Sequence, residues 1–186
     1  MSYTLLEVKQ LLSRTPRVLR VLLFGLNESL LSLRKRDDGF TPSEVVGHLI
    51  ANDEVNFIPR MNYLLAGDFS KPFPPLDREY TERGFDKNLS LEKRLELFES
   101  LRKKNLEILE NNVSTSDLSK KNVHPDFPDV TLGNLLTYWV VHDLTHLFQV
   151  IEILGLHYKE AVGRWGDFLK ILRIPDGLAR TGFETE

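Results

Sequence analysis

The stretch TLGNLLTYWVVHDLTHLFQVIEILG, residues 131–155, decides the fold that the sequence predicts. Its apolar residues recur every three or four positions, which is the spacing of one face of an α-helix and not of a strand. Thr131 is a favourable N-cap residue and Gly155 a favourable stop signal, so we expect a helix that continues to about Leu154. A helix with such a long apolar stripe needs other helices to cover it.

Two histidines, His142 and His146, lie in the middle of this apolar stripe. With about 100° of rotation per residue, their side chains fall within an arc of about 80° that also contains Trp139 and Val150. A polar ring buried there costs roughly 1 to 3 kcal/mol unless its nitrogens find partners. One metal ion satisfies both rings at once, because side chains four residues apart share a helix face and imidazole is a common ligand of divalent metals.

Two other interpretations of this pair are open. The histidines could be core residues that form hydrogen bonds with backbone carbonyls or with buried water. They could also belong to the HExxH motif of zinc proteases, but Asp143 stands where that motif has glutamate, and Gln149 stands where a metzincin has glycine. The residue pattern therefore disfavours a protease.

A metal site built on His142 and His146 requires at least one more protein ligand, which must come from another helix. We assign this ligand to His48, which lies one turn inside a second predicted helix and is flanked by apolar residues. His124 and His157 lie in the segments before and after the long helix. We expect both to be loop or surface histidines, with His124 as a candidate for the mouth of the site.

Three further side chains are candidates for orienting or tuning the ligands. Asp53 falls on the apolar arc of its predicted helix, where a carboxylate needs a partner. It could orient a ligand histidine, act as a general base on a water at the metal, or pair with Arg60. Gln149 follows His146 by one turn and is the third candidate. The pattern favours an orienting or structural role for Asp53, and it assigns no catalytic residue.

The rest of the chain predicts further helices around a long connection. In order along the chain, we expect two abutting helical pieces over 5–33 that meet at Thr15-Pro16, and then a solvated turn over 34–39. A helix over 42–66, kinked near Val55 by Pro59, should follow, and after it an irregular connection over 67–88. The last expected elements are a helix over 91–112 and a short helix over 161–172. No segment alternates with period two for long enough to form a sheet. The expected fold class is therefore all-α, a four-helix bundle with a long loop after its second helix and an extra C-terminal helix, in a single domain over 1–186.

The composition fits such a domain and excludes several function classes. The chain has 186 residues, of which 41% are hydrophobic, and it has no cysteine, which excludes disulfides, thiolate ligands and cysteine nucleophiles. Its net charge of -3 is spread over both signs and offers no basic face to nucleic acid. Because we find no signal segment and no uncharged stretch that could cross a bilayer, we expect a cytoplasmic protein without a membrane partner.

The chain resembles the DinB-like (DinB/YfiT) family of helical bundles over residues 41–172. The motifs that carry the resemblance are Gly47-His48-Leu49, Asp53 with Asn56-Phe57-Ile58-Pro59-Arg60, His124-Pro125, Val130-Thr131-Leu132, the run from Trp139 to His146, Gln149, and Ala161-Val162-Gly163-Arg164-Trp165. The chain departs from the family pattern at four positions, namely Asp53, Asn56, Phe57 and Arg164.

The resemblance implies an up-down-down-up bundle in which His48, His142 and His146 bind nickel or zinc with open coordination positions, in a protein that often forms homodimers. Family members include transferases and isomerases that use the low-molecular-weight thiols bacillithiol, mycothiol or glutathione. We therefore expect a metal-dependent enzyme, a thiol-dependent S-transferase or a hydrolase, that acts on a small molecule. The alternatives are a non-catalytic, stress-linked metal- or ligand-binding bundle, and a helical interaction module whose histidines only pack.

Overall fold

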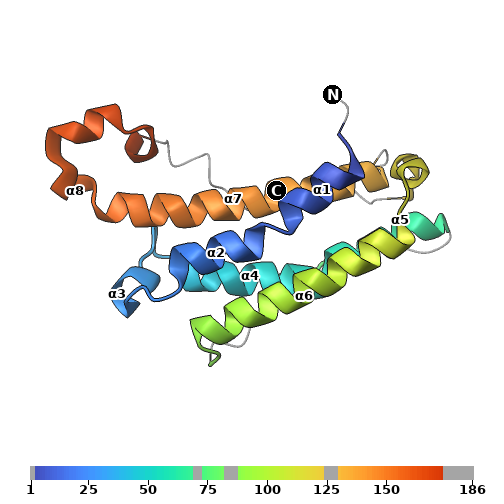
Figure 1. The fold of residues 1–186 in the computed structure, drawn as a ribbon, viewed down its shortest axis with the longest axis horizontal. Helices are drawn as coiled ribbons and strands as arrows, with labels where there is room; N and C mark the ends of the chain where they lie inside the picture. Colours follow the sequence, from blue (N-terminus) through green and yellow to red (C-terminus); the bar gives the residue numbers. More distant parts are fainter. Residues whose placement is uncertain (1–2, 69–72, 82–87, 124–129, 174–186) are drawn as a thin grey trace.

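The computed structural model describes residues 3–68, 73–81, 88–123 and 130–173 (Figure 1). Within these ranges the regular elements are helices, apart from an isolated antiparallel bridge between Lys121 and Thr131. In order they are α1 (Leu5–Leu12), α2 (Thr15–Leu23), α3 (Glu28–Leu31), α4 (Pro42–Val55), α5 (Phe57–Ala66), α6 (Leu91–Asn112), the 3-10 helix η2 (Thr115–Ser119), α7 (Leu132–His157), α8 (Lys159–Val162), and the 3-10 helices η3 (Gly163–Phe168) and η4 (Lys170–Arg173).

The longer helices form four rods that pack side by side as a bundle (Figure 1). The first rod is α1 followed by α2, the second is α4 followed by α5, and α6 and α7 are the third and fourth. Each of the first two rods packs against both α6 and α7. The buried apolar residues form two clusters, one of which contains Leu12, Phe57, Leu109 and Leu136, and the other Leu19, Leu49, Leu95 and Val150. The first rod and α7 therefore run in one direction and the other two rods in the opposite direction, as expected.

The first rod is divided into more pieces than the sequence pattern predicts. The junction at Thr15-Pro16 is confirmed, since Pro16 lies in the first turn of α2. The expectation that the second piece continues to Leu33 is wrong. After α2 the chain turns at Gly25, whose φ of 81° suits glycine, and the side chain of Asn27 then caps the separate short helix α3.

The second rod follows its prediction closely. Thr41 caps α4 through a capping box with Glu44, as the sequence signature indicates. The predicted kink near Val55 appears as a break at Asn56, whose φ and ψ are -106° and -68°. Pro59 explains the break, because it lacks the N–H that would bond to the carbonyl of Val55. Further along the chain, α6 has the predicted bounds, and the side chain of Ser90 caps it.

The C-terminal part of the chain requires two corrections. The expected stop of the long helix at Gly155 is wrong, because α7 continues to His157. Gly155 instead leaves room for the side chain of Ile171, because a Cβ at this position would lie 3.3 Å from Cδ1 of Ile171. The expected helix over 161–172 is also wrong: α8, η3 and η4 replace it, with Gly163 at a φ of 57° between α8 and η3.

A layer of buried polar side chains separates the two apolar clusters. We call it the polar layer; it comprises Thr15, Asn52, Asp53, Arg102, Asn105, Asp143 and His146, each at most 3% exposed. All four rods contribute to it. Because burying so many polar groups is costly unless they are paired, their contacts determine what this level of the bundle can do. No helix in the described ranges has both the length and the apolar character that a membrane crossing requires.

Candidate metal centre

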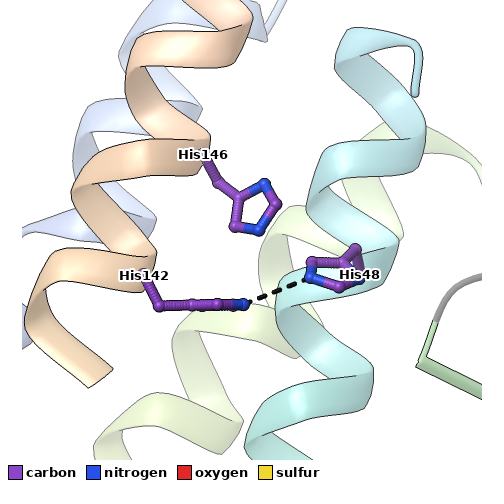
Figure 2. Close-up of side chains that lie close together, drawn as sticks. All are labelled: His48, His142 and His146. Carbon is purple, nitrogen blue, oxygen red and sulfur yellow. Dashed lines mark hydrogen bonds between the residues drawn. The ribbon is translucent and has the colours of Figure 1, made fainter. Parts of the chain in front are cut away.

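Three histidines meet beside the polar layer (Figure 2). His48 comes from α4, and His142 and His146 come from successive turns of α7. One nitrogen of each ring lies within 4.8 Å of the corresponding nitrogens of the other two. The Nε2 atoms of His48 and His142 are 3.2 Å apart. The structure thus brings together the three histidines that the sequence analysis selected.

The outer nitrogens of two of these rings have acceptors. Nδ1 of His48 lies 2.7 Å from the backbone carbonyl oxygen of Thr81, and Nδ1 of His146 lies 2.9 Å from Oε1 of Gln149. Because these oxygens only accept, each Nδ1 must carry the proton and donate it. This fixes the tautomer in which Nε2 is unprotonated and has a free lone pair.

The inner nitrogens of His48 and His146 therefore present lone pairs to the centre of the cluster. Nε2 of His146 is buried and has no hydrogen-bond partner among the described residues. Nε2 of His48 is an acceptor that lies 3.2 Å from Nε2 of His142, which can donate to it in the metal-free protein, and 3.2 Å from the side-chain amide of Asn52. Converging lone pairs at this distance repel one another unless a proton or a cation lies between them. A divalent cation satisfies all three atoms, so the residues present fit such an ion.

The surroundings lower the pKa of His48 and of His146 and so favour the neutral form of these two rings, which is the form that binds metal. Burial, together with the neighbouring His142, lowers the pKa of His48 to about 4, although the carbonyl of Thr81 opposes the shift. Burial and the two neighbouring imidazoles likewise hold the pKa of His146 well below its usual value. At neutral pH a metal ion therefore does not have to displace protons from either ring.

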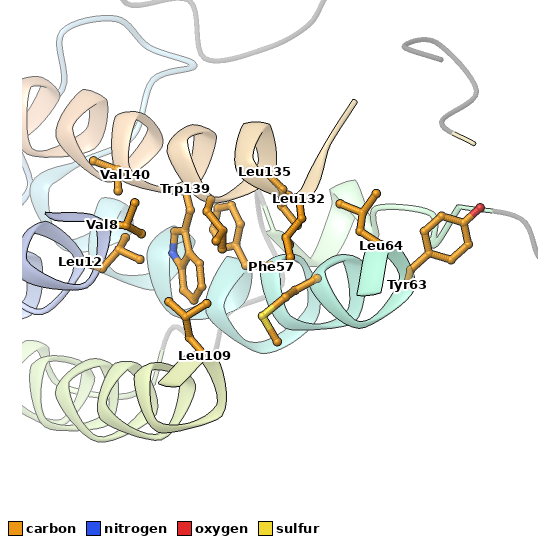
Figure 3. Packing of buried hydrophobic residues seen from close by; sticks show 12 residues of the cluster. Val8, Leu12, Phe57, Tyr63, Leu64, Leu109, Leu132, Leu135, Trp139 and Val140 are labelled. Carbon is orange, nitrogen blue, oxygen red and sulfur yellow. The ribbon is translucent and has the colours of Figure 1, made fainter. Parts of the chain in front are cut away.

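Aromatic side chains surround the histidines. The ring centroid of Phe40 lies 5.0 Å from that of His48, and the centroids of Phe57 and Tyr138 lie 5.5 Å and 5.8 Å from that of His142. Phe57 is itself fixed by stacking on Trp139 at 4.6 Å, inside the first apolar cluster (Figure 3). These rings exclude water from the sides of the cluster, which strengthens electrostatic interactions within it.

Asp53 has a different partner from the one considered in the sequence analysis. It pairs with Arg102 of α6 and not with Arg60: Nε of Arg102 lies 2.7 Å from Oδ2, and Nη2 lies 2.8 Å from Oδ1. Trp139 also donates to Oδ1 of Asp53. With both carboxylate oxygens engaged, Asp53 is not placed as a general base. Arg60 lies over the ring of Phe73, 5.0 Å from its centroid.

Sequence reasoning missed Arg102 altogether and treated Asp143 only as a departure from a protease motif. Arg102 also binds Asp143 and the carbonyl oxygen of Leu12, so it connects all four rods. The position of Arg102 around its helix could have revealed its burial. Arg102 lies four residues after Phe98 and seven before Leu109, on the apolar face of α6.

The two remaining histidines are His124 and His157. His124 lies outside the described residues, so the prediction that it stands at the mouth of the site stays a prediction. His157 is exposed at the C-terminal end of α7, where its ring contacts that of Tyr158. It is a surface histidine, as expected.

Two known proteins are similar to this chain. A curated relative from Oceanobacillus iheyensis, named "Putative metal-dependent hydrolase OB0782", is 26% identical over 138 residues, which cover 74% of this chain and 78% of the relative. The fold is similar to that of YfiT from Bacillus subtilis, described as "a probable metal-dependent hydrolase with an unusual four-helix bundle topology". The TM-score is 0.68 at 23% identity, covering 89% of this chain and 91% of that one.

A sequence model of one protein family matches most of the chain. The match covers residues 11–150, which include α2, the second rod, α6, the three clustered histidines and the polar layer. The protein described here therefore belongs to the DinB superfamily.

Proposed function

We propose that this protein is a metal-dependent enzyme that acts on a small molecule, with a divalent cation, nickel or zinc, held by His48, His142 and His146. The observation that carries the proposal is the convergence of three Nε2 atoms, two of them with Nδ1 bound to a fixed acceptor. The names of the relative from Oceanobacillus iheyensis and of YfiT, both metal-dependent hydrolases by description, support the same class.

The chain's own residues would bind, orient and shield the ion. The three imidazoles supply the ligands, the carbonyl of Thr81 and the amide of Gln149 hold two of the rings in place, and the aromatic side chains exclude water. When bound, a divalent ion lowers the pKa of a water or thiol that it coordinates, and so supplies a nucleophile at neutral pH. Hydrolysis and transfer of a low-molecular-weight thiol both start from such a nucleophile.

A non-catalytic bundle with a closed site is less well supported. A closed site needs a fourth protein ligand, for which Asp53 was the candidate. Both oxygens of Asp53 are engaged by Arg102, and within the described ranges the group that could hold a metal consists of the three histidines alone. A site with three protein ligands leaves positions for a substrate, as catalytic sites do.

Metal content tests the metal centre. The purified protein, depleted with a chelator and reloaded with zinc or nickel, should retain about one ion per chain by elemental analysis, as one mononuclear site requires. His142→Ala should abolish retention, whereas His157→Ala, which removes an exposed histidine of the same helix, should leave it unchanged. Full retention in His142→Ala would contradict the proposal.

The reaction class requires a separate assay. The zinc- and nickel-loaded proteins should be tested for hydrolysis of simple esters and amides, and for conjugation of bacillithiol or glutathione to an electrophile. The expected result is turnover in one of these assays that is lost in His142→Ala and kept in His157→Ala. Full metal loading with no turnover in any of them would favour the non-catalytic bundle.

A further inference from the structure

The ring of His142 differs from the other two in its outer nitrogen. Nδ1 of His48 and Nδ1 of His146 have acceptors at 2.7 Å and 2.9 Å, but Nδ1 of His142 is buried without a hydrogen bond to any described residue. The nearest carboxylate oxygen recorded for it is Oδ1 of Asp143, at 3.9 Å. A small movement of the imidazole would bring this pair to the usual hydrogen-bond distance of about 2.9 Å.

Asp143 is held firmly by the polar layer. Both of its carboxylate oxygens accept from the guanidinium of Arg102. Arg102 donates in addition to Asp53 and to the carbonyl oxygen of Leu12, so every N–H of the guanidinium is used. A carboxylate fixed in this way is a stationary acceptor beside the histidine cluster.

The polar layer also has a surplus of negative charge. When ionised, Asp53 and Asp143 together carry two negative charges, and Arg102 supplies a single positive charge against them. In that state one negative charge is left over in a buried region where charges interact strongly, and burial accordingly raises the pKa of Asp53 although Arg102 opposes the shift. Neutral imidazoles do not balance it, whereas a cation bound by them would.

From this geometry we propose that Asp143, fixed by Arg102, is the positioning residue for His142 and accepts a hydrogen bond from its Nδ1–H when a metal ion is bound. The inference rests on the proposed metal centre and extends it. The hydrogen bond selects the tautomer in which Nε2 faces the ion, which completes the pattern already seen for His48 and His146. It also connects the ion to all four rods through Arg102.

A matched pair of variants tests this role. Asp143→Asn and Asp53→Asn each remove one carboxylate bound to Arg102 and nearly conserve shape, but only Asp143 lies beside His142. The dissociation constant for zinc, measured by competition with a chromophoric chelator, should rise about 10- to 100-fold in Asp143→Asn. In Asp53→Asn the constant should rise clearly less, because this variant loses the same charge but keeps the acceptor beside His142.

The outcomes separate this inference from the proposed function. Failure of the wild type to bind zinc or nickel would overturn both. Tight binding by the wild type with equal affinities in the two variants would overturn only the role of Asp143. If Asp143→Asn does not fold, the ring nitrogens of His142 in the zinc-loaded wild type decide by NMR: a protonated, slowly exchanging Nδ1 is expected, and a rapidly exchanging proton there would overturn the inference.

Discussion

The two apolar clusters and the polar layer between them hold their side chains in different ways. In the clusters, residues such as Leu136 and Leu64 are fixed by the shape of their neighbours, and any apolar side chain of similar volume can serve. In the polar layer, Arg102 is fixed by five directed hydrogen bonds to three partners. The comparison teaches that the clusters specify a bundle, whereas the polar layer specifies one arrangement of its helices around the histidines.

The largest effect should come from Arg102→Met, which conserves much of the volume but leaves Asp53 and Asp143 buried without their partner. We expect a loss of about 3 to 5 kcal/mol in the free energy of unfolding, measured with urea. Lys103→Met, at an exposed position of the same helix, should change it by less than about 0.5 kcal/mol. A loss below about 1 kcal/mol in Arg102→Met would mean that packing volume, and not the hydrogen bonds of Arg102, stabilises the polar layer, as it stabilises the clusters.

Methionine, which replaces Arg102 in the variant above, should be tolerated at a buried leucine of the apolar clusters. Leu136 is fully buried, and Leu136→Met should cost less than about 1.5 kcal/mol, because volume and polarity are nearly conserved. Leu136→Ala should cost about 2 to 5 kcal/mol, because it leaves a cavity. Urea unfolding of both variants measures the difference. Equal losses in the two would show that volume does not govern this cluster.

Acid should destabilise the histidine cluster before it affects ordinary carboxylates. Burial holds the pKa of His48 at about 4, against 6.5 for a free histidine, so the unfolded chain binds more protons than the folded one in this window. The stability of the metal-free protein should be complete above pH 6.5 and fall as the pH is lowered to about 4. Unfolding in a chelator-containing buffer at several pH values measures this. A flat profile over that range would contradict the assigned burial of neutral imidazoles.

The smallest effect should come from the amide that holds His146. Gln149→Met removes the acceptor of Nδ1 and keeps the length of the side chain, so His146 loses its fixed tautomer but not its packing. Zinc affinity should fall by about tenfold, at the low end of the range for partners of ligand histidines. The exposed Phe148→Ala on the same turn is the control for stability and affinity. Unchanged affinity in Gln149→Met would show that packing alone orients the ring.

Helical phase explains what the sequence could predict. His142 and His146 are recognisable because polar rings rarely occupy the middle of an apolar stripe, and Thr41 and Thr131 mark helix starts by local chemistry alone. Arg102 has the same helical phase signal, but a long basic side chain at such a position usually extends to solvent, so only its neighbours on other rods reveal its role.

Two of the corrections have a common physical cause, which is contact between distant segments. Asp53 was considered with Arg60 because the two are close in sequence, whereas its partner Arg102 lies on another rod. Gly155 resembles a helix stop, but it is a glycine that allows Ile171 to approach. Local patterns predict where helices start and which face they bury. They do not predict which side chains from different helices meet.

The central claim is that one ion is bound by imidazoles from two helices. X-ray absorption spectroscopy of the zinc-loaded protein tests it most directly. The account predicts three imidazole nitrogens at roughly 2.0 to 2.1 Å from zinc, with the remaining positions filled from solvent, and two imidazoles in His48→Ala. A spectrum with fewer than three imidazoles in the wild type, or one that His48→Ala leaves unchanged, would contradict it.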